Sequence, residues 1–161
     1  MDNLFPGLFM ASYDHVLDAQ GRVSLPSDWR KRDGETELVM IPARDKALLL
    51  LPVEVFREFV GKSAKLAIAN PKMQMAMAYL GSVSRMCRCD KQGRIALDKE
   101  MLASIGVKRN LKLIGAITHI RICAPENWVM PDNPDAYFDE IQQVSDSDDG
   151  FGDFLKGVLG K

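Results

Sequence analysis

Short apolar runs alternate with polar turns through the first half of the chain, and this pattern predicts strands. Residues 9–17 form the first predicted strand, and the alternating Val23-Ser24-Leu25 predicts the partner strand that returns beside it after a turn. Residues 38–41 and 48–51 are almost wholly apolar and are separated by a charged loop. We interpret these two runs as buried strands.

Three short helices are predicted around these strands. Pro26 suits a first helical turn, and a basic helix is expected at about residues 27–32. A second helix is expected at residues 53–60, where apolar side chains recur on one face. Asn70 and Pro71 are an N-cap and a first-turn proline, and they open a methionine-rich helix. We interpret that helix as an adaptable packing element rather than a cofactor site.

The second half of the chain repeats the first at a constant spacing. Asp18-Ala19-Gln20-Gly21-Arg22 returns as Asp90-Lys91-Gln92-Gly93-Arg94, and the correspondence continues without an insertion until Phe56 meets Trp128. The predicted elements recur in order: strands at residues 83–89, 95–97, 111–114 and 117–123, a helix at about 99–105 capped by Asp98, and a helix from Pro125 that carries Trp128. We therefore expect one supersecondary unit in two copies, related by a pseudo-twofold axis.

The repeated turn has residues suited to closing it. The aspartate at its first position, Asp18 or Asp90, can accept N–H bonds from the backbone that follows. The glycine, Gly21 or Gly93, can adopt the positive φ that the turn needs. A structural role is therefore predicted for these four residues.

Composition and charge exclude some classes of protein and favour others. The first residues contain no basic segment before an apolar run, so no secretory signal is expected. The longest aliphatic run, residues 47–51, is too short to span a bilayer. Residues 1–130 hold 19 Lys and Arg against 14 Asp and Glu, whereas residues 131–161 hold 2 against 8. A basic core followed by an acidic tail suggests that the core meets a polyanion.

These motifs resemble the MraZ family of bacterial transcriptional regulators, which is related to the AbrB and MazE group. The resemblance is carried by the two D-x-x-G-R turns and by Tyr13-Asp14-His15, Leu25-Pro26 with Arg30, Pro52 with Glu54 and Phe56, and Glu126 with Trp128. It covers about residues 9–140. The second copy departs from the first at Asp98, which stands where Pro26 does, and at Leu102, which stands where Arg30 does.

The resemblance implies an α+β fold, mainly β with short helices. In this fold the two repeats form a swapped-hairpin, double-split β-barrel of the AbrB, MazE and MraZ type. The first repeat is then expected at residues 9–66, a connecting helix at 67–80, the second repeat at 81–140 and an acidic C-terminal tail at 141–161. A ring-shaped homo-oligomer, octamer-like in the family, is also implied.

The resemblance also implies a function. The protein is expected to bind double-stranded DNA at repeated boxes in the promoter of the division and cell-wall gene cluster and to regulate transcription there. It is expected to be no enzyme, to need no cofactor or metal, to be cytoplasmic and nucleoid-associated, and to have no membrane partner. The alternative is a ring-forming structural or interaction protein that does not bind DNA.

Arginines at the two turns are the main candidates for DNA contact. The planar fork of Arg22 or Arg94 can bind guanine O6 and N7, or a phosphate, in two places. The predicted DNA-binding set is completed by Gln20, Lys91 and Gln92 at the turn tips and by Arg30. On the residues alone, Arg30, Lys31, Arg32 and Arg44 are interpreted as solvated charges rather than contacts. In the structural alternative, Asp18 and Arg22 form an ion pair that locks the turn. We interpret the turn as structural and its arginine as functional.

Hydrolysis and zinc binding are the chemical alternatives. A pseudo-dyad of aspartates is typical of a carboxylate pair that shares a proton, but a small hydroxyl residue and glycine should then follow each aspartate. Ala19-Gln20 and Lys91-Gln92 stand there instead. Cys87, Cys89 and Cys123 lack the paired spacings and fourth ligand of a standard zinc site, so we interpret them as reduced cytosolic core thiols.

The C-terminal tail begins with a proline-containing linker after Trp128 and continues into the acidic residues 145–150. Apolar residues at helical spacing follow in residues 151–159. So short a helix would form only by docking. We hypothesise that it docks on a neighbouring subunit and mildly inhibits DNA binding at low salt; a disordered tail is the alternative.

Overall fold

The computed structural model describes residues 8–130 and 132–145, without the side chains of residues 62, 63, 144 and 145. The chain divides into two compact units, one up to Trp128 and one from Val129 onward. The described strands are β1 (Ser12–Val16), β2 (Arg22–Ser24), β3 (Glu37–Ala43), β4 (Ala47–Pro52), β5 (Arg85–Arg88), β6 (Arg94–Ala96), β7 (Asn110–Gly115) and β8 (Ile120–Cys123). The helices are η1 (Ser27–Trp29), α1 (Val53–Ala67), α2 (Pro71–Val83), α3 (Lys99–Ser104), η2 (Pro125–Asn127) and α4 (Asp135–Ser145).

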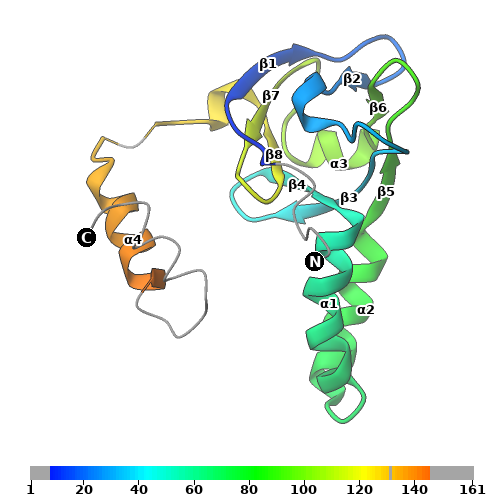
Figure 1. The fold of residues 1–161 in the computed structure, drawn as a ribbon, viewed down its shortest axis with the longest axis vertical. Helices are drawn as coiled ribbons and strands as arrows, with labels where there is room; N and C mark the ends of the chain where they lie inside the picture. The colour runs from blue at the N-terminus through cyan, green and yellow to red at the C-terminus, as the bar shows by residue number, and fades with distance from the viewer. Residues whose placement is uncertain (1–7, 131, 146–161) are drawn as a thin grey trace. The chain divides into compact units, whose positions relative to one another are not determined.

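The first unit is built from an antiparallel sheet and a separate two-stranded ribbon. The sheet has six strands in the order β1-β7-β8-β4-β3-β5, and the ribbon pairs β2 with β6 (Figure 1). Most strand pairs join one repeat to the other, as in β1 with β7, β3 with β5, and β4 with β8. The predicted α+β class, with strands exchanged between two copies, is confirmed.

One predicted strand pairing is wrong. Val23-Ser24-Leu25 does not return beside the first strand, because β1 pairs with β7 and β2 pairs with β6. A turn alone does not fix the partner of the strand that follows it, and here pairing across the repeats buries Val23 and Ile95 in the core. The first strand also begins later than predicted, at Ser12, because Ala11 has a positive φ.

The core of the first unit lies between the ribbon, the sheet and α3. Its largest fully buried side chains come from both repeats: Leu38, Met40, Leu48, Leu50, Ile95, Leu111, Leu113, Ile120, Ile122 and Cys123. Phe9 and Trp29 add an edge-to-face aromatic pair with ring centroids 5.8 Å apart. The repeats therefore share one core and cannot be separated into two independent domains.

The helices in the first repeat differ in length from the predictions. The basic helix expected at residues 27–32 is only the single turn η1, because Arg30 is extended and the Lys31 N–H bonds to Thr36 Oγ1 at 2.9 Å. The helix expected to end at residue 60 continues to Ala67. Gly61 is tolerated inside α1, because packing against α2 offsets a propensity cost of about 1 kcal/mol.

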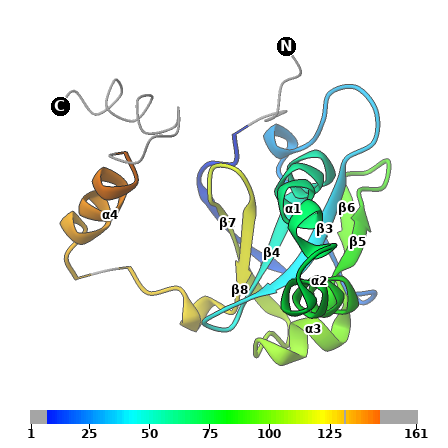
Figure 2. The same cartoon turned by 90° about the horizontal axis from the view of Figure 1, so that it is seen from below.

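Helix α2 follows its predicted start and forms a hairpin with α1. The Asn70 side chain accepts N–H bonds from Lys72 and Met73, and Pro71 is the first helical residue. The two helices lie side by side and project from the sheet, with the free end pointing away from β2 and β6 (Figure 1 and Figure 2). None of the described residues of α2 is fully buried.

In the second repeat, α3 is capped by Asp98 as predicted, through a 2.9 Å bond from the Met101 N–H. The strand predicted at residues 117–123 is shorter, because Ile117 has a positive φ in the preceding turn. The helix predicted to carry Trp128 is reduced to the turn η2. Trp128 follows η2 and packs on a small buried cluster around Ala47 and Ile114.

The second unit contains α4, an acidic amphipathic helix that the sequence pattern did not predict. Its exposed apolar residues are Tyr137, Phe138 and Ile141. The helix predicted at residues 151–159 and most of the acidic run before it lie outside the described residues. Among the helices that the structure describes, none is long and apolar enough to cross a membrane.

Candidate nucleic-acid interface

The first turn is closed by its aspartate and glycine. The Asp18 carbonyl accepts an N–H bond from Gly21 at 3.0 Å, and the Asp18 N–H donates to the Arg22 carbonyl at 3.0 Å. Asp18 Oδ1 accepts the N–H groups of Gln20 and Arg22 at 2.9 and 2.8 Å. Gly21 has a φ of +74°, as the sequence predicts. The turn is therefore locked by side-chain and backbone bonds together.

The second turn repeats this geometry. Asp90 Oδ1 accepts the N–H groups of Gln92 and Arg94, both at 2.9 Å, and Gly93 has a φ of +81°. One contact is added, because the Arg94 Nη2 group donates to Gln92 Oε1 at 2.6 Å. The structural role predicted for both aspartates and both glycines fits these bonds.

Each turn is joined to the strand of the other repeat. The Leu25 N–H donates to the Gly93 carbonyl at 2.8 Å, and the Leu97 N–H donates to the Gly21 carbonyl at 3.1 Å. These bonds continue the β2–β6 ladder at both ends. The two turns are consequently held at opposite ends of one rigid ribbon.

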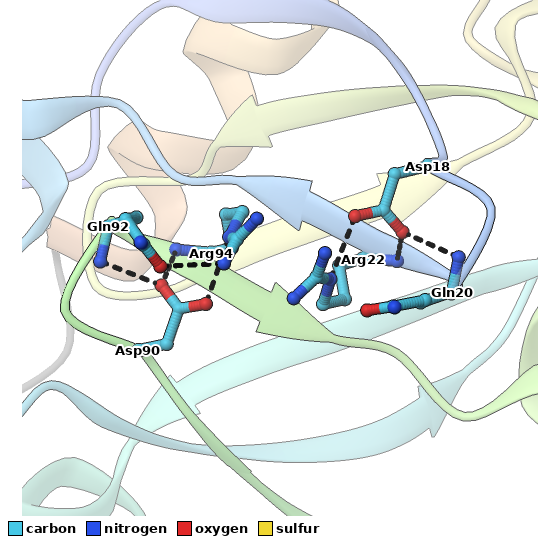
Figure 3. A network of polar contacts seen from close by, with 6 residues as sticks. All are labelled: Asp18, Gln20, Arg22, Asp90, Gln92 and Arg94. Carbon is cyan, nitrogen blue, oxygen red and sulfur yellow. Dashed lines mark hydrogen bonds and ion pairs between the residues drawn. The ribbon is translucent and has the colours of Figure 1, made fainter.

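The ribbon presents two arginines on its outer face. Val23 and Ile95 oppose each other and are buried, so their neighbours point the other way. Arg22 lies opposite Ala96, and Arg94 lies opposite Ser24, on that outer face. Figure 3 shows the two arginines between the two turn aspartates, along the same ribbon.

Each arginine forms an ion pair with its own aspartate through Nε alone. The distances to the carboxylate Oδ2 atoms are 2.8 Å for Arg22 and 2.9 Å for Arg94. Bonds from the arginine N–H groups lower the pKa of the Asp18 and Asp90 carboxyls, with the backbone N–H contributing most, so both stay ionised at neutral pH. The terminal amino groups of Arg22 form no hydrogen bond or ion pair with any of the described residues.

The structural and functional interpretations of the arginine are therefore compatible. Nε holds the side chain against the turn. The Nη groups of Arg22 are left for a ligand, whereas in Arg94 one Nη group already donates to Gln92. The side chains of Arg22 and Arg94 are 26% and 32% exposed, which is enough for the outer edge of each guanidinium to be reached. A planar fork fixed in this way suits guanine or phosphate.

The other predicted contacts occupy three different environments. Gln20 and Lys91 are exposed at the turn tips, whereas the Gln92 side chain bonds to Arg94. Arg30 is half-buried, and its guanidinium lies against Gly93 of the other repeat. The interpretation of Arg30 as a solvated charge is wrong, because its Nε is buried without a hydrogen-bond partner among the described residues.

The rival chemistries lack suitable geometry. Asp18 and Asp90 lie at opposite ends of the ribbon, and each is paired with its own arginine (Figure 3). A proton-sharing pair would raise one carboxyl pKa, whereas both are lowered. Cys87 and Cys123 are buried on different strands, and burial raises the pKa of Cys87 to about 11. Within the described ranges, no group of three or more His, Cys, Asp or Glu is placed to hold a metal ion.

One outer-face residue was missed by the sequence reasoning. Ser24 is exposed opposite Arg94, and its hydroxyl can donate or accept a hydrogen bond. Alternation around the apolar Val23 places Arg22 and Ser24 on one face, so the signal was available. It was overlooked because that strand was assigned to the wrong partner.

The family model and the known proteins that match this chain carry the same family name. Residues 8–77 match a family model described as "MraZ protein, putative antitoxin-like". The chain is 28% identical to the transcriptional regulator MraZ of Lachnoclostridium phytofermentans, over 90% of this chain and 98% of the relative. It is 32% identical to the transcriptional regulator MraZ of Desulforapulum autotrophicum, over 78% of this chain and 86% of the relative. The chain therefore belongs to the MraZ family, and both of these relatives are named as transcriptional regulators and not as enzymes.

Proposed function

We propose that this protein is a sequence-specific DNA-binding transcriptional regulator that inserts the β2–β6 ribbon into the major groove. The observation that carries the proposal is the pair of arginines on the outer face of the ribbon, each held by its own turn aspartate. The major groove of B-DNA admits a two-stranded ribbon, and arginine is the commonest side chain that reads guanine there.

The turns support this role by limiting the motion of the arginines. An exposed arginine usually loses rotamer freedom when it binds, which costs about 0.5–1.5 kcal/mol per side chain. The Nε bonds of Arg22 and Arg94 remove much of that freedom before DNA arrives. Gln92 restrains Arg94 further. We propose that Gln20 and Lys91 at the tips contact phosphates or base edges, and that Arg30 contributes charge beside the second turn.

We also propose that the protein acts as a ring-shaped homo-oligomer. The α1–α2 hairpin supports self-association, because large apolar side chains are exposed along it: Phe59, Leu66, Ile68, Met75 and Tyr79. A ring would present several ribbons to repeated boxes, and avidity would multiply modest affinities. The proposed target is the promoter of the division and cell-wall gene cluster, and the proposed location is the cytoplasm, on the nucleoid.

A ring-forming interaction protein without DNA binding is the second candidate, and the same exposed hairpin favours it. The discriminating experiment measures binding of the purified protein to DNA from immediately upstream of its own gene and to a scrambled duplex, at 50 and 200 mM salt. We expect tighter binding to the upstream DNA, with affinity falling steeply as salt rises. Assembly of the protein without preference for either duplex would favour the second candidate.

A further inference from the structure

A cleft of about 760 Å³ lies beside the first turn. It is lined by Leu17, Asp18, Ala19 and Gly21 from the first repeat and by Lys99, Leu102, Ala103, Val107, Lys108 and Arg109 from the second. The Lys99 stem lies along the turn, since a Cβ on Gly21 would be 3.8 Å from its Cε. The cleft thus adjoins one end of the ribbon that carries Arg22.

The cleft has an apolar floor and a cationic rim. Leu102 and Val107 are buried, whereas Lys99, Lys108 and Arg109 are exposed. Within the described part of the chain, these three cations form no ion pair. The one carboxylate in the lining, on Asp18, is already paired with Arg22. The rim is therefore positively charged, and no described carboxylate neutralises its three cations.

The second turn has no equivalent rim. At the repeat spacing, Lys99, Lys108 and Arg109 correspond to Ser27, Thr36 and Glu37, which carry no positive charge. Thr36 is buried, and Glu37 is paired with Arg88 at 3.1 Å.

A different side chain occupies the position beside the second turn. Leu102 corresponds to Arg30, whose guanidinium packs on Gly93. The backbone of the two turns is nearly the same, but the charge beside them is not.

We propose that Lys99, Lys108 and Arg109 bind backbone phosphates of the DNA next to the first turn, so that the ribbon lies on its site with a fixed polarity. This inference rests on the proposed function. A pseudo-symmetric ribbon alone would bind equally well in either direction. A phosphate-binding rim at one end makes the two directions unequal in energy, because phosphate contacts fix the orientation of a protein on the duplex.

The test compares the double variant Lys99→Gln/Lys108→Gln with the control Arg44→Gln/Lys46→Gln, which removes the same charge from exposed positions in the loop between β3 and β4. Binding to upstream DNA is measured from 50 to 200 mM salt. Two lost phosphate contacts should reduce the slope of log K against log salt by about 2. Affinity should fall at least about tenfold at 50 mM salt, and the gap should narrow about tenfold by 200 mM. The control should bind like wild type.

Polarity is tested on duplexes whose phosphates are replaced by neutral methylphosphonates on one flank of the footprinted site or on the other. Wild type should lose more affinity when the flank beside the first turn is neutralised than when the other flank is, and the double variant should lose that excess. The inference would be overturned if wild type lost the same affinity with either flank neutralised. It would also be overturned if the double variant Lys99→Gln/Lys108→Gln bound DNA like the control. Failure of wild type to prefer upstream DNA would instead defeat the proposed function.

A third arm separates DNA phosphate from a free anion. Binding of inorganic phosphate is followed by NMR shifts of wild type and the double variant. Inorganic phosphate could shift the cleft signals of wild type but not those of the double variant, while both proteins bind DNA equally well. That result would assign the rim to a small anion and overturn the proposed contact with DNA phosphates. Matched melting temperatures of the cleft and control variants establish that both remain folded.

Discussion

In the repeated turn, the aspartate, the glycine and the arginine each have a separate task. The aspartate binds two backbone N–H groups with one oxygen and the arginine Nε with the other. The glycine supplies the positive φ and a carbonyl that the opposite repeat needs. These tasks follow from elementary stereochemistry and were predictable from sequence. The position of Arg30 against Gly93 was not, because it depends on how the two repeats pack.

The two turn glycines should differ in their tolerance of a methyl group. Gly21→Ala places an L-residue at positive φ and should cost about 1–2 kcal/mol. Gly93→Ala meets the same strain and also places Cβ 2.6 Å from the Arg30 Cζ, so it should destabilise more. Denaturant unfolding of both variants, alone and with Arg30→Ala, measures the difference. In the Arg30→Ala background the two costs should become equal; a difference that persists would show that Arg30 does not cause it.

At the scale of elements, local pattern predicted strands well and their partners poorly. Residues 38–41 and 48–51 became β3 and β4, which pair with each other as an antiparallel hairpin. The β2–β6 pairing joins residues far apart in sequence, and it is decided by burial of both strands and by the bonds from Leu25 and Leu97. Helix α1 extends beyond its predicted end at residue 60, because packing against α2 stabilises the longer helix.

The exposed face of the α1–α2 hairpin should control assembly. Phe59 and Tyr79 are 62% and 67% exposed, so replacing both with Ser should change the stability of one protomer by little. The same change should lower the molecular mass of the assembly in size-exclusion chromatography with light scattering. Glu58→Ala, at an exposed position on the same helix, serves as the control. An unchanged mass for the Phe59→Ser/Tyr79→Ser variant would place the subunit contact elsewhere.

At the scale of the whole molecule, the repeat was the most informative feature of the sequence. It predicted two copies with equivalent turns, and the structure places those turns at the two ends of one ribbon. It did not predict how the copies differ, because that difference comes from side chains contributed across the repeats, such as Arg30 on one side and Lys99 on the other. Helix α4 was missed because the prolines that precede it and its own acidic residues are typical of a linker.

Binding of upstream DNA by Arg22→Ala and Arg94→Ala tests the central claim most directly. Each variant removes one outer-face guanidinium, and each should weaken specific binding by about 1–3 kcal/mol while the melting temperature and assembly mass stay near wild type. The control Arg44→Ala removes one exposed charge in the loop between β3 and β4 and should bind like wild type. Wild-type affinity and sequence preference in both arginine variants would contradict the account and leave the arginines with a purely structural role.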